Sequence, residues 1–399
     1  MSLYARAYSG MIKNVMSKMK TSLPPTVEGT GSRADAAEYC KNNGYQRVLI
    51  MTDSAIHKFG IPDKITEALT AKEIKWTIFE DILPNPTFSM VEAAKKKGLA
   101  FKAQCVIAVG GGSVMDCAKL TTAAMADPEN DLLTLATPFK VKVQAVPLIT
   151  VPTTAGTGAE VSMSALISDD KTHIKHNAAS PKIMAVLAIL DGETMANMPP
   201  KVTASTGFDA LSHAVESYCS TADRKGEEHT YGTQAVRIIM EALPRAFHDP
   251  GEVSYRNQMS KAAFLAGMAL NKEMAGYAHP FAHALGAVYN LPHGELIACT
   301  LPPVMRLNQE VCRDKFADLA VISGLGNNGE NPEKLAERFI SAVENMRKEL
   351  NLPATLPQLK KEDYPALIKL IFKDAKNYPT PRFINKKQAI EILDKIRVG

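Results

Sequence analysis

The chain has 399 residues, of which 46% are hydrophobic and 22% charged, a composition typical of a folded globular protein. A chain of this length predicts roughly two or three domains and can bury a large core. The formal net charge is only +4, and Lys and Arg do not cluster with interleaved aromatic residues. We therefore expect neither a nucleic-acid partner nor a membrane surface, and a small-molecule substrate is the better expectation.

Six cysteines are scattered along the chain without a CxxC pair. This spacing favours reduced thiols over a disulfide framework or a zinc ribbon. We therefore expect a cytoplasmic protein.

The first 27 residues contain four basic residues and no acid before Glu28. This composition loosely resembles a transit peptide, whereas a secretory signal is not expected, because an apolar h-region and a small-residue cleavage site are missing. We favour the alternative that residues 4–20 form an amphipathic helix, which packs on the body of the protein or on a second subunit.

Short apolar, β-branched runs alternate with helical stretches in the first half of the chain. These runs lie at 47–52, 75–80, 105–110, 146–151 and 186–190. Alternating β and α units predict a parallel sheet that is covered by helices on both faces.

After residue 191 the apolar residues follow a helical spacing, and β-rich runs disappear. The clearest helical stretches lie at 202–218, 232–247, 258–270 and 333–350. Pro199 and Pro200 mark the start of the first long helix. We predict an α/β domain over 1–190 and an all-α domain over 191–399.

A glycine-rich segment, GGGS at 110–113, follows the strand predicted at 105–110 and precedes a helix. Backbone N–H groups and the helix N-terminus would face one point there, and such a point attracts a diphosphate. A plain strand-to-helix turn is the alternative, because the segment is neither a GxGxxG nor a Walker motif. A second loop at 149–162 places threonines among glycines at the same predicted sheet edge, where α/β proteins bind ligands. Together the two loops favour a dinucleotide site.

Asp53 follows the strand predicted at 47–52. A carboxylate at this place commonly accepts hydrogen bonds from ribose hydroxyls and repels the extra phosphate of NADP, so we favour NAD over NADP. The alternative is that Asp53 only caps a helix that begins at Ser54. Lys175 could reach the cofactor or lie at the surface.

One aspartate and four histidines stand in two clusters with the spacing of metal ligands. Asp209 and His213 lie in GFDALSHAVESY, and His279, His283 and His293 lie within 276–294. Residues four apart project from one face of a helix, and one carboxylate with several imidazoles suits Fe, Mn or Zn. A single histidine on an apolar helix is more often a buried, hydrogen-bonded residue, but five candidates in two clusters favour a metal site. The remaining histidines are expected at the surface without a role: His57, His173, His176, His229 and His248.

The motifs GGGSxxD, PTTAGTGAE, GFDALSHAVE and HxxxHxLGxxYxxPHG, with LPNPT at 83–87, resemble those of the iron-containing (group III) alcohol dehydrogenases. The resemblance begins near Pro25 and runs to the C-terminus. It implies the fold of the dehydroquinate synthase-like superfamily, in which a Rossmann-like parallel sheet domain is followed by an α-helical domain, with a cleft between them. It also implies Fe²⁺, with Zn²⁺ or Mn²⁺ as alternatives, NAD as cofactor, an alcohol or aldehyde substrate, and a homo-dimer or larger homo-oligomer.

The resemblance also implies roles for particular residues. The implied metal ligands are Asp209, His213, His279 and His293, all of which are present. His283 matches the family's further active-site histidine, which is not a ligand, and it is the candidate for proton transfer. The implied dinucleotide-binding residues are Asp53, Asn85, Gly110, Gly111, Gly112, Ser113, Asp116, Thr153, Thr154, Thr157, Leu166 and Lys175. Residues 1–24 exceed the family's usual start, and NYPTPR at 377–382 stands where relatives usually carry Asn-Pro-Arg.

Two enzyme types of the same superfamily are the alternatives, glycerol dehydrogenase and dehydroquinate synthase. Both bind NAD and usually zinc. The synthase needs several basic residues for a phosphate-bearing acid, and the helical half lacks such a set beside its histidines. A structural metal protein or a plain nucleotide-binding module would leave one of the two motif sets without a purpose. We therefore predict a metal-dependent oxidoreductase that transfers hydride between NAD(H) and a primary alcohol, diol or aldehyde.

Overall fold

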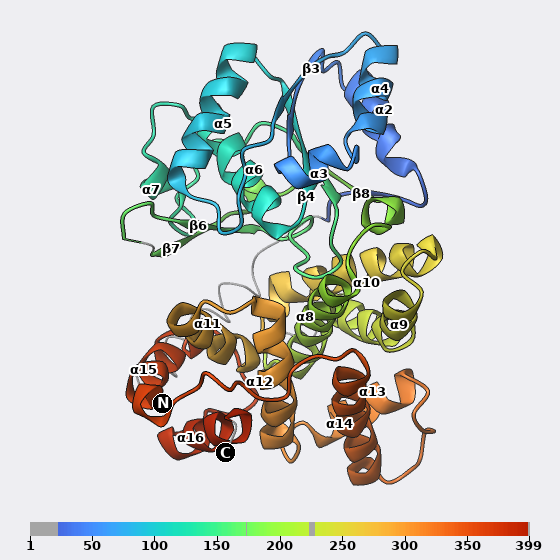
Figure 1. The fold of residues 1–399 in the computed structure, drawn as a ribbon, viewed down its shortest axis with the longest axis vertical. Coiled ribbons are helices and arrows are strands. Elements are labelled where there is room, and N and C mark those ends of the chain that lie inside the picture. Colours follow the sequence, from blue (N-terminus) through green and yellow to red (C-terminus); the bar gives the residue numbers. More distant parts are fainter. Residues whose placement is uncertain (1–22, 173, 223–227, 398–399) are drawn as a thin grey trace. The chain divides into compact units, whose positions relative to one another are not determined.

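The computed structural model describes residues 23–172, 174–222 and 228–397 (Figure 1). The helix predicted over 4–20, His173 and the side chain of His229 lie outside this description. Contacts divide the chain into two compact units. One comprises the described residues of Thr21–Met198 with Gly251–Phe264, and the other those of Pro199–Pro250 and Leu265–Gly399.

The first unit is built on a six-stranded sheet in which every neighbouring pair is parallel. In chain order its strands are Thr26–Glu28 (β1), Arg47–Met51 (β2), Lys75–Phe79 (β3), Cys105–Gly110 (β4), Leu148–Pro152 (β5) and Leu187–Leu190 (β8). They lie side by side in the order β1-β8-β5-β4-β2-β3. The five predicted strands are confirmed, and β1 is an addition. A separate antiparallel ribbon, which was not predicted, is formed by Ser164–Ser168 (β6) and Lys175–Ala179 (β7).

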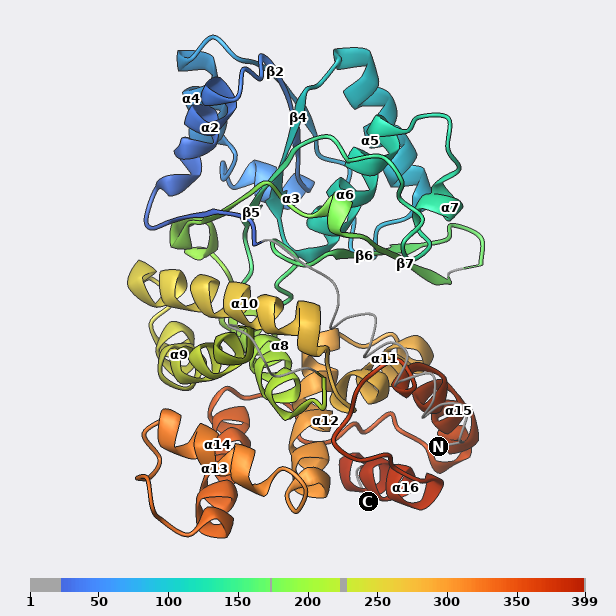
Figure 2. The same ribbon diagram turned by 180° about the vertical axis from the view of Figure 1, so that it is seen from behind.

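Helices cover both faces of this sheet, as predicted (Figure 1 and Figure 2). The helices of the unit are Asp35–Asn42 (α2), Ser54–Lys58 (α3), Asp63–Ala71 (α4), Phe88–Phe101 (α5), Gly112–Ala126 (α6) and Leu132–Leu135 (α7). Successive strand residues point to opposite faces, so Val48 and Ile50 join the core beneath α2 and α4. Leu49 and Met51 join the core beneath α5 and α6. The strands are apolar on both sides because both sides are buried.

The second unit is helical. Its helices are Pro200–Cys219 (α8), Glu228–His248 (α9), the C-terminal part of Val253–Glu273 (α10), Ala278–Tyr289 (α11), His293–Asn308 (α12), Arg313–Ile322 (α13), Pro332–Glu349 (α14), Tyr364–Ala375 (α15) and Lys386–Ile396 (α16). Helix α8 begins at Pro200, as predicted, since a proline in the first turn lacks only an amide that the helix would leave unpaired. Every residue of α8 from 207 to 219 is buried. The polar side chains in this stretch therefore need partners inside the protein.

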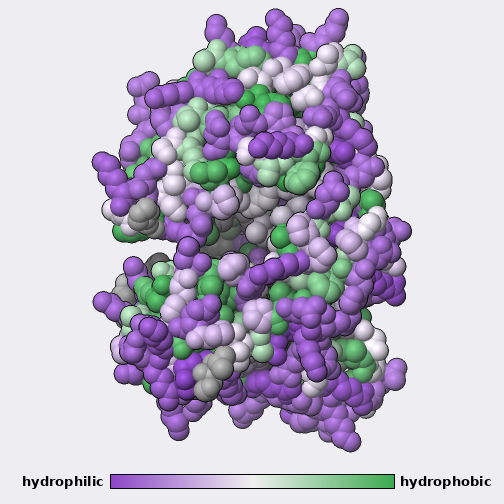
Figure 3. Space-filling model, in the orientation of Figure 1, coloured by the Kyte–Doolittle hydropathy of each residue, from purple (hydrophilic) through white to green (hydrophobic). Residues whose placement is uncertain are grey.

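Within the described part of the chain, no helix has the length and hydropathy needed to cross a membrane. All six cysteines are free and buried. On the face drawn in Figure 3, each unit is covered mainly by hydrophilic residues, and apolar residues form separate patches.

Candidate functional site

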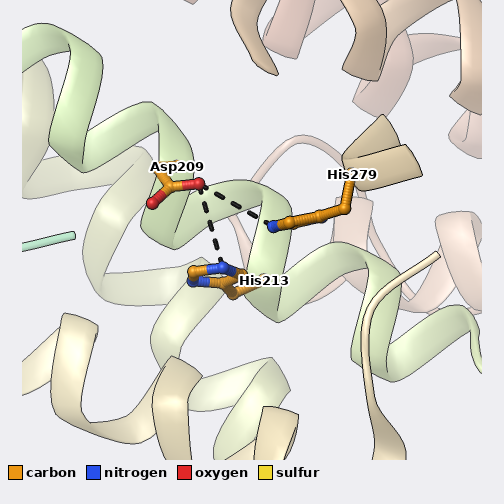
Figure 4. A group of neighbouring side chains, drawn as sticks. All are labelled: Asp209, His213 and His279. Atoms are coloured by element: carbon orange, nitrogen blue, oxygen red, sulfur yellow. Dashed lines mark ion pairs between the residues drawn. The ribbon is translucent and has the colours of Figure 1, made fainter. Parts of the chain in front are cut away.

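Three side chains from two helices converge inside the helical unit (Figure 4). Asp209 and His213 lie one turn apart on α8, and His279 lies in the first turn of α11. All three are at most 5% exposed. The Nε2 atoms of His213 and His279 lie 3.8 and 3.9 Å from the same oxygen, Oδ1 of Asp209. The two predicted clusters are therefore brought together at one carboxylate oxygen.

His293, the first residue of α12, adds a third imidazole to this group. Its Nε2 lies 3.4 Å from Oδ1 of Asp209, and its side chain is 40% exposed. The adjacent glycine makes this position available, because a Cβ on Gly294 would lie 2.4 Å from the carbonyl oxygen of Ser205 on α8. Only glycine lets the start of α12 approach α8 so closely.

Asp209, His213 and His279 each offer a ligand atom, and these three atoms lie within 4.8 Å of one another, close enough to hold one metal ion. Ligand atoms at about 2.1 Å from a tetrahedral ion lie roughly 3.4 Å apart, close to the 3.4 to 3.9 Å that separate Oδ1 of Asp209 from the three imidazole nitrogens. Oδ1 of Asp209 and Nε2 of His279 are buried and form no hydrogen bond of acceptable geometry with the described residues. Such unpaired buried atoms cost free energy. An ion bound by both atoms would remove that cost.

The surroundings favour the protonation states that metal ligands need. Burial lowers the pKa of His213 to about 4 and that of His279 to about 3, although the nearby Asp209 carboxylate opposes both shifts. Burial also acts to raise the pKa of Asp209, but the imidazoles of His213, His293 and His279 outweigh it and hold that pKa well below its usual range. At neutral pH the two buried imidazoles are therefore neutral and the carboxylate is charged.

Glu216, two turns after Asp209 on α8, contacts this group but was not predicted. Its side chain is buried, and its Oε2 lies 2.7 Å from Nδ1 of His279. Burial raises the pKa of Glu216 to about 7, against the amides of Ala278 and Gly276. A signal was present in the sequence, because positions 209, 213 and 216 follow the i, i+4, i+7 spacing of one helix face.

His283 lies one turn after His279 and faces a different partner. Its Nδ1 lies 2.8 Å from Oδ2 of Asp374 on α15, and its side chain is 40% exposed. Its ring centroid lies 5.9 Å from that of His279 and 5.3 Å from that of His293. An imidazole beside the metal-ligand group, held through one nitrogen, has a second nitrogen for proton exchange. Asp374 was not predicted.

In the α/β unit, the glycine segment joins β4 to α6, and Ser113 lies in the first turn of this helix. The amides of a first helical turn have no partner within the helix. The segment lies close to the threonine loop: Gly110 is hydrogen-bonded to Thr153, and a Cβ added at Gly111 would lie 3.3 Å from Oγ1 of Thr154. The Thr153 amide donates to the Gly110 carbonyl at 3.1 Å. A Cβ on Gly112 would lie 3.0 Å from Cγ2 of Thr157, so the two predicted loops pack tightly together.

The ribbon of β6 and β7 carries two more of the predicted residues. The amide of Leu166 donates to Oδ2 of Asp116 at 3.1 Å, and Nζ of Lys175 donates to Oδ1 of Asn85 at 2.9 Å. Burial raises the pKa of Asp116 to about 6, although Lys119 opposes the shift. The ribbon is therefore tied both to α6 and to the loop before α5.

Asp53 caps α3, as the alternative interpretation predicted. Its Oδ1 accepts hydrogen bonds from the amides of Ala55 and Ile56 at 3.0 and 2.9 Å. Asp53, Gly111 and Thr153 also follow the carboxyl ends of the neighbouring parallel strands β2, β4 and β5. From β2 the chain continues to β3 on one side and then returns to β4 on the other. Ligands of α/β proteins bind at such a reversal of strand order.

Comparisons with known proteins agree with this arrangement. A family model described as iron-containing alcohol dehydrogenase matches residues 24–192, and the C-terminal model of the Fe-containing alcohol dehydrogenase family matches residues 203–397. The chain is 32% identical to lactaldehyde reductase of Escherichia coli (strain K12) over 371 residues, which cover 91% of this chain and 95% of that protein. It is 31% identical to NADPH-dependent butanol dehydrogenase of Clostridium saccharobutylicum over 391 residues, covering 96% and 98% of the two chains.

A solved structure of 1,3-propanediol oxidoreductase is similar to the whole fold, with a TM-score of 0.90 at 31% sequence identity. The similarity covers 94% of this chain and 99% of that one. The chain therefore belongs to the iron-containing alcohol dehydrogenase family, as an oxidoreductase that acts on alcohols or aldehydes.

Proposed function

We propose that this chain is an NAD(H)-dependent dehydrogenase that interconverts a primary alcohol or diol with the corresponding aldehyde. One divalent metal ion, iron(II) or in its place zinc or manganese, is held by Asp209, His213, His279 and His293. The observation that carries the proposal is the approach of three imidazole nitrogens to one unpaired carboxylate oxygen, at 3.4, 3.8 and 3.9 Å. This donor set suits a first-row divalent ion better than magnesium or calcium.

The α/β unit binds the dinucleotide in this proposal. The residues proposed to contact it are Asp53, Asn85, Gly110, Gly111, Gly112, Ser113, Asp116, Thr153, Thr154, Thr157, Leu166 and Lys175. The amides at the start of α6 suit a diphosphate, and the carboxylate of Asp53 suits ribose hydroxyls and disfavours the extra phosphate of NADP. Family membership does not decide between the two cofactors, since the butanol dehydrogenase above is named as NADPH-dependent. Among the residues proposed to contact the dinucleotide, Asp53 is the one that favours NAD over NADP.

When bound, the metal supplies a Lewis acid that lowers the pKa of the alcohol hydroxyl, and the nicotinamide accepts or supplies hydride. Burial lowers the pKa of His213 and of His279, so both imidazoles are neutral and able to bind the ion. His283 carries the alcohol proton between substrate and solvent. Its partial exposure and its contact with Asp374 at 2.8 Å support this role.

The test is anaerobic purification, measurement of the bound metal, and a screen of primary alcohols, diols and aldehydes with NAD and with NADP. We expect about one metal ion per chain, which is lost with a chelator, and net NADH formation that requires the metal. Net NADH production also separates a dehydrogenase from a synthase-type enzyme, which uses NAD only transiently. A protein that binds no divalent metal, or that forms no NADH with any of these alcohols, would contradict the proposal.

The proposal includes a homo-oligomer in the cytoplasm. The six buried, free cysteines suit a reducing compartment. Light scattering during size-exclusion chromatography measures the assembly, and a monomer at micromolar concentration would contradict it.

A further inference from the structure

We infer that Glu216 is a positioning residue for the metal: it fixes the tautomer and the orientation of His279, so that Nε2 of this imidazole carries a lone pair directed at the ligand group. The inference rests on the proposed metal site. It concerns a residue that is not itself a ligand, and it assigns to that residue a share of the metal affinity.

The Glu216 carboxylate makes two contacts at the start of α11. Its Oε2 lies 2.7 Å from Nδ1 of His279, and its Oε1 accepts a hydrogen bond from the amide of Ala278 at 2.7 Å. Ala278 and His279 are the first two residues of α11. A carboxylate is favourable at a helix N-terminus, where free amides and the helix dipole attract negative charge. One side chain of α8 therefore holds both the imidazole and the start of the helix that carries it.

The contact with Glu216 also determines which nitrogen of His279 carries the proton. A neutral imidazole that binds a metal through Nε2 carries its proton on Nδ1, so Nδ1 of His279 then donates to Oε2 of Glu216, which accepts as a carboxylate. That Nε2 lies 3.9 Å from Oδ1 of Asp209 and is buried without a hydrogen-bond partner among the described residues. Metal-binding histidines usually donate their second ring N–H to such an acceptor, which fixes the ring and raises its basicity.

The two buried imidazoles, His213 and His279, differ at Nδ1. Nδ1 of His213 is also buried, yet it has no hydrogen-bond partner among the described residues. Of these two buried imidazoles, only His279 therefore has a carboxylate hydrogen-bonded to its Nδ1 within the described part of the chain. If the contact between Glu216 and His279 is lost, no carboxylate at Nδ1 fixes the tautomer of His279.

The test is the substitution Glu216→Gln in the full-length protein. In one orientation the amide nitrogen of Gln faces Nδ1 of His279, which then accepts and moves the ring proton to Nε2. In the other orientation this amide nitrogen opposes the Ala278 N–H. We expect Zn²⁺ affinity, measured by competition with a chromophoric chelator on metal-free protein, to fall by about 10–100-fold. The visible spectrum of the Co²⁺ form should change as well, which reports the ligand geometry independently of activity.

A second variant keeps the charge and moves the carboxylate. A Cβ on Gly276 would lie 2.7 Å from Oε1 of Glu216, so Gly276→Ala displaces the side chain by contact. We expect weaker Zn²⁺ binding here too, although every ligand is retained. This variant gives the answer if Glu216→Gln does not fold.

The matched control is Asp318→Asn. Asp318 accepts a hydrogen bond from the hydroxyl of Tyr218, which follows Glu216 by two residues on α8, at 3.0 Å. This change removes a carboxylate contact of α8 without touching an imidazole, and Zn²⁺ affinity should stay unchanged. If the parent protein binds no metal, the proposed site itself fails. If the parent binds Zn²⁺ and both Glu216→Gln and Gly276→Ala bind it equally well, the inference about Glu216 is wrong.

Discussion

At the scale of single residues, the histidines differ in burial and in the carboxylate that each one faces. His213 and His279 are 5% exposed, and burial lowers the pKa of each well below the ordinary value. The side chain of His283 is 40% exposed and lies against Asp374. An imidazole that faces Oδ1 of Asp209 suits metal ligation, and a partly exposed one that faces a different carboxylate suits proton exchange. We therefore expect the same type of side chain to serve two roles because its surroundings differ.

This difference predicts separable effects of two substitutions. His283→Ala should lower kcat by about 10²–10⁴-fold, the usual contribution of a general acid or base, and leave the bound metal unchanged. His279→Ala should remove the metal and the activity together. Steady-state kinetics and atomic emission spectroscopy on the same preparations measure both quantities. Loss of metal from His283→Ala would mean that His283 is a ligand.

A second prediction separates the two interpretations of Asp53. Serine is also a good N-cap, so Asp53→Ser should keep the cap of α3, in which Asp53 accepts from Ala55 and Ile56. It removes the negative charge that is proposed to repel the extra phosphate of NADP. We expect kcat/KM with NADP to rise relative to NAD by about tenfold, or about 1.4 kcal/mol, with an unchanged melting temperature. An unchanged cofactor ratio would leave Asp53 as a cap only.

At the scale of elements, the contact between α8 and the start of α12 brings His293 to the proposed metal ligand Asp209. A Cβ on Gly294 would meet the Ser205 carbonyl oxygen at 2.4 Å. Gly294→Ala should therefore destabilise the metal-free protein by about 1–3 kcal/mol and weaken metal binding. Chemical unfolding and chelator competition measure the two effects.

The matched control for this prediction is Gly286→Ala in α11. A Cβ there would lie 3.4 Å from a methyl group of Leu296, an ordinary contact. Alanine in a helix interior is favoured over glycine by up to about 1 kcal/mol, so this variant should be as stable as the parent or more stable. Equal effects of the two substitutions would show that the approach of α12 to α8 has no special importance.

The elements that the sequence predicted are those with a clear period. Five strands of the sheet and the helices α8, α9, α10 and α14 were predicted, because buried strands read as apolar runs and helices as an apolar stripe. Strand β1 has only three residues, too few for a period, and β7 reads KHNAA, without apolar alternation. Because β7 has no such pattern, its pairing with β6 depends on contacts with other parts of the fold.

The residues of the candidate site also divide into those with a local sequence pattern and those without one. Asp209 and His213 were predicted from local spacing, and Glu216 could have been predicted in the same way. Asp374 lies 91 residues after His283, and only the packing of α15 against α11 brings the two together. Partners of this kind could not be predicted, because no local pattern relates residues on distant helices.

At the scale of the whole molecule, each unit contains a buried carboxylate whose pKa is raised to about 7, Glu160 in the α/β unit and Glu216 in the helical unit. A raised pKa means that the folded protein holds the proton more tightly than the unfolded chain does. These groups therefore make stability depend on pH in the range in which most surface carboxylates are already ionised. Glu160 is the better residue for a test of this pH dependence, because it lies in the α/β unit and is not part of the proposed metal site.

Glu160 is 2% exposed, and its Oε1 has no hydrogen-bond partner among the described residues. Burial raises its pKa from 4.5 to about 7, although Lys119 opposes the shift. Its favourable contribution to stability is complete below pH 4.5 and is lost as pH rises through about 7, where the buried group must ionise. The loss amounts to about 3 kcal/mol, since one pKa unit corresponds to about 1.4 kcal/mol.

Glu160→Gln keeps the shape of the side chain and removes its titration. Relative to the parent, the metal-free variant should therefore gain stability progressively between pH 4.5 and 7, with little further gain just above pH 7. Urea unfolding at pH 4.5, 5.5, 6.5 and 7.5 measures the difference. Glu67→Gln, at an exposed position on α4 of the same unit, should show a difference that does not change with pH. If Glu160→Gln behaves like this control, Glu160 is ionised in the folded protein as readily as in the unfolded chain, and its burial imposes no cost.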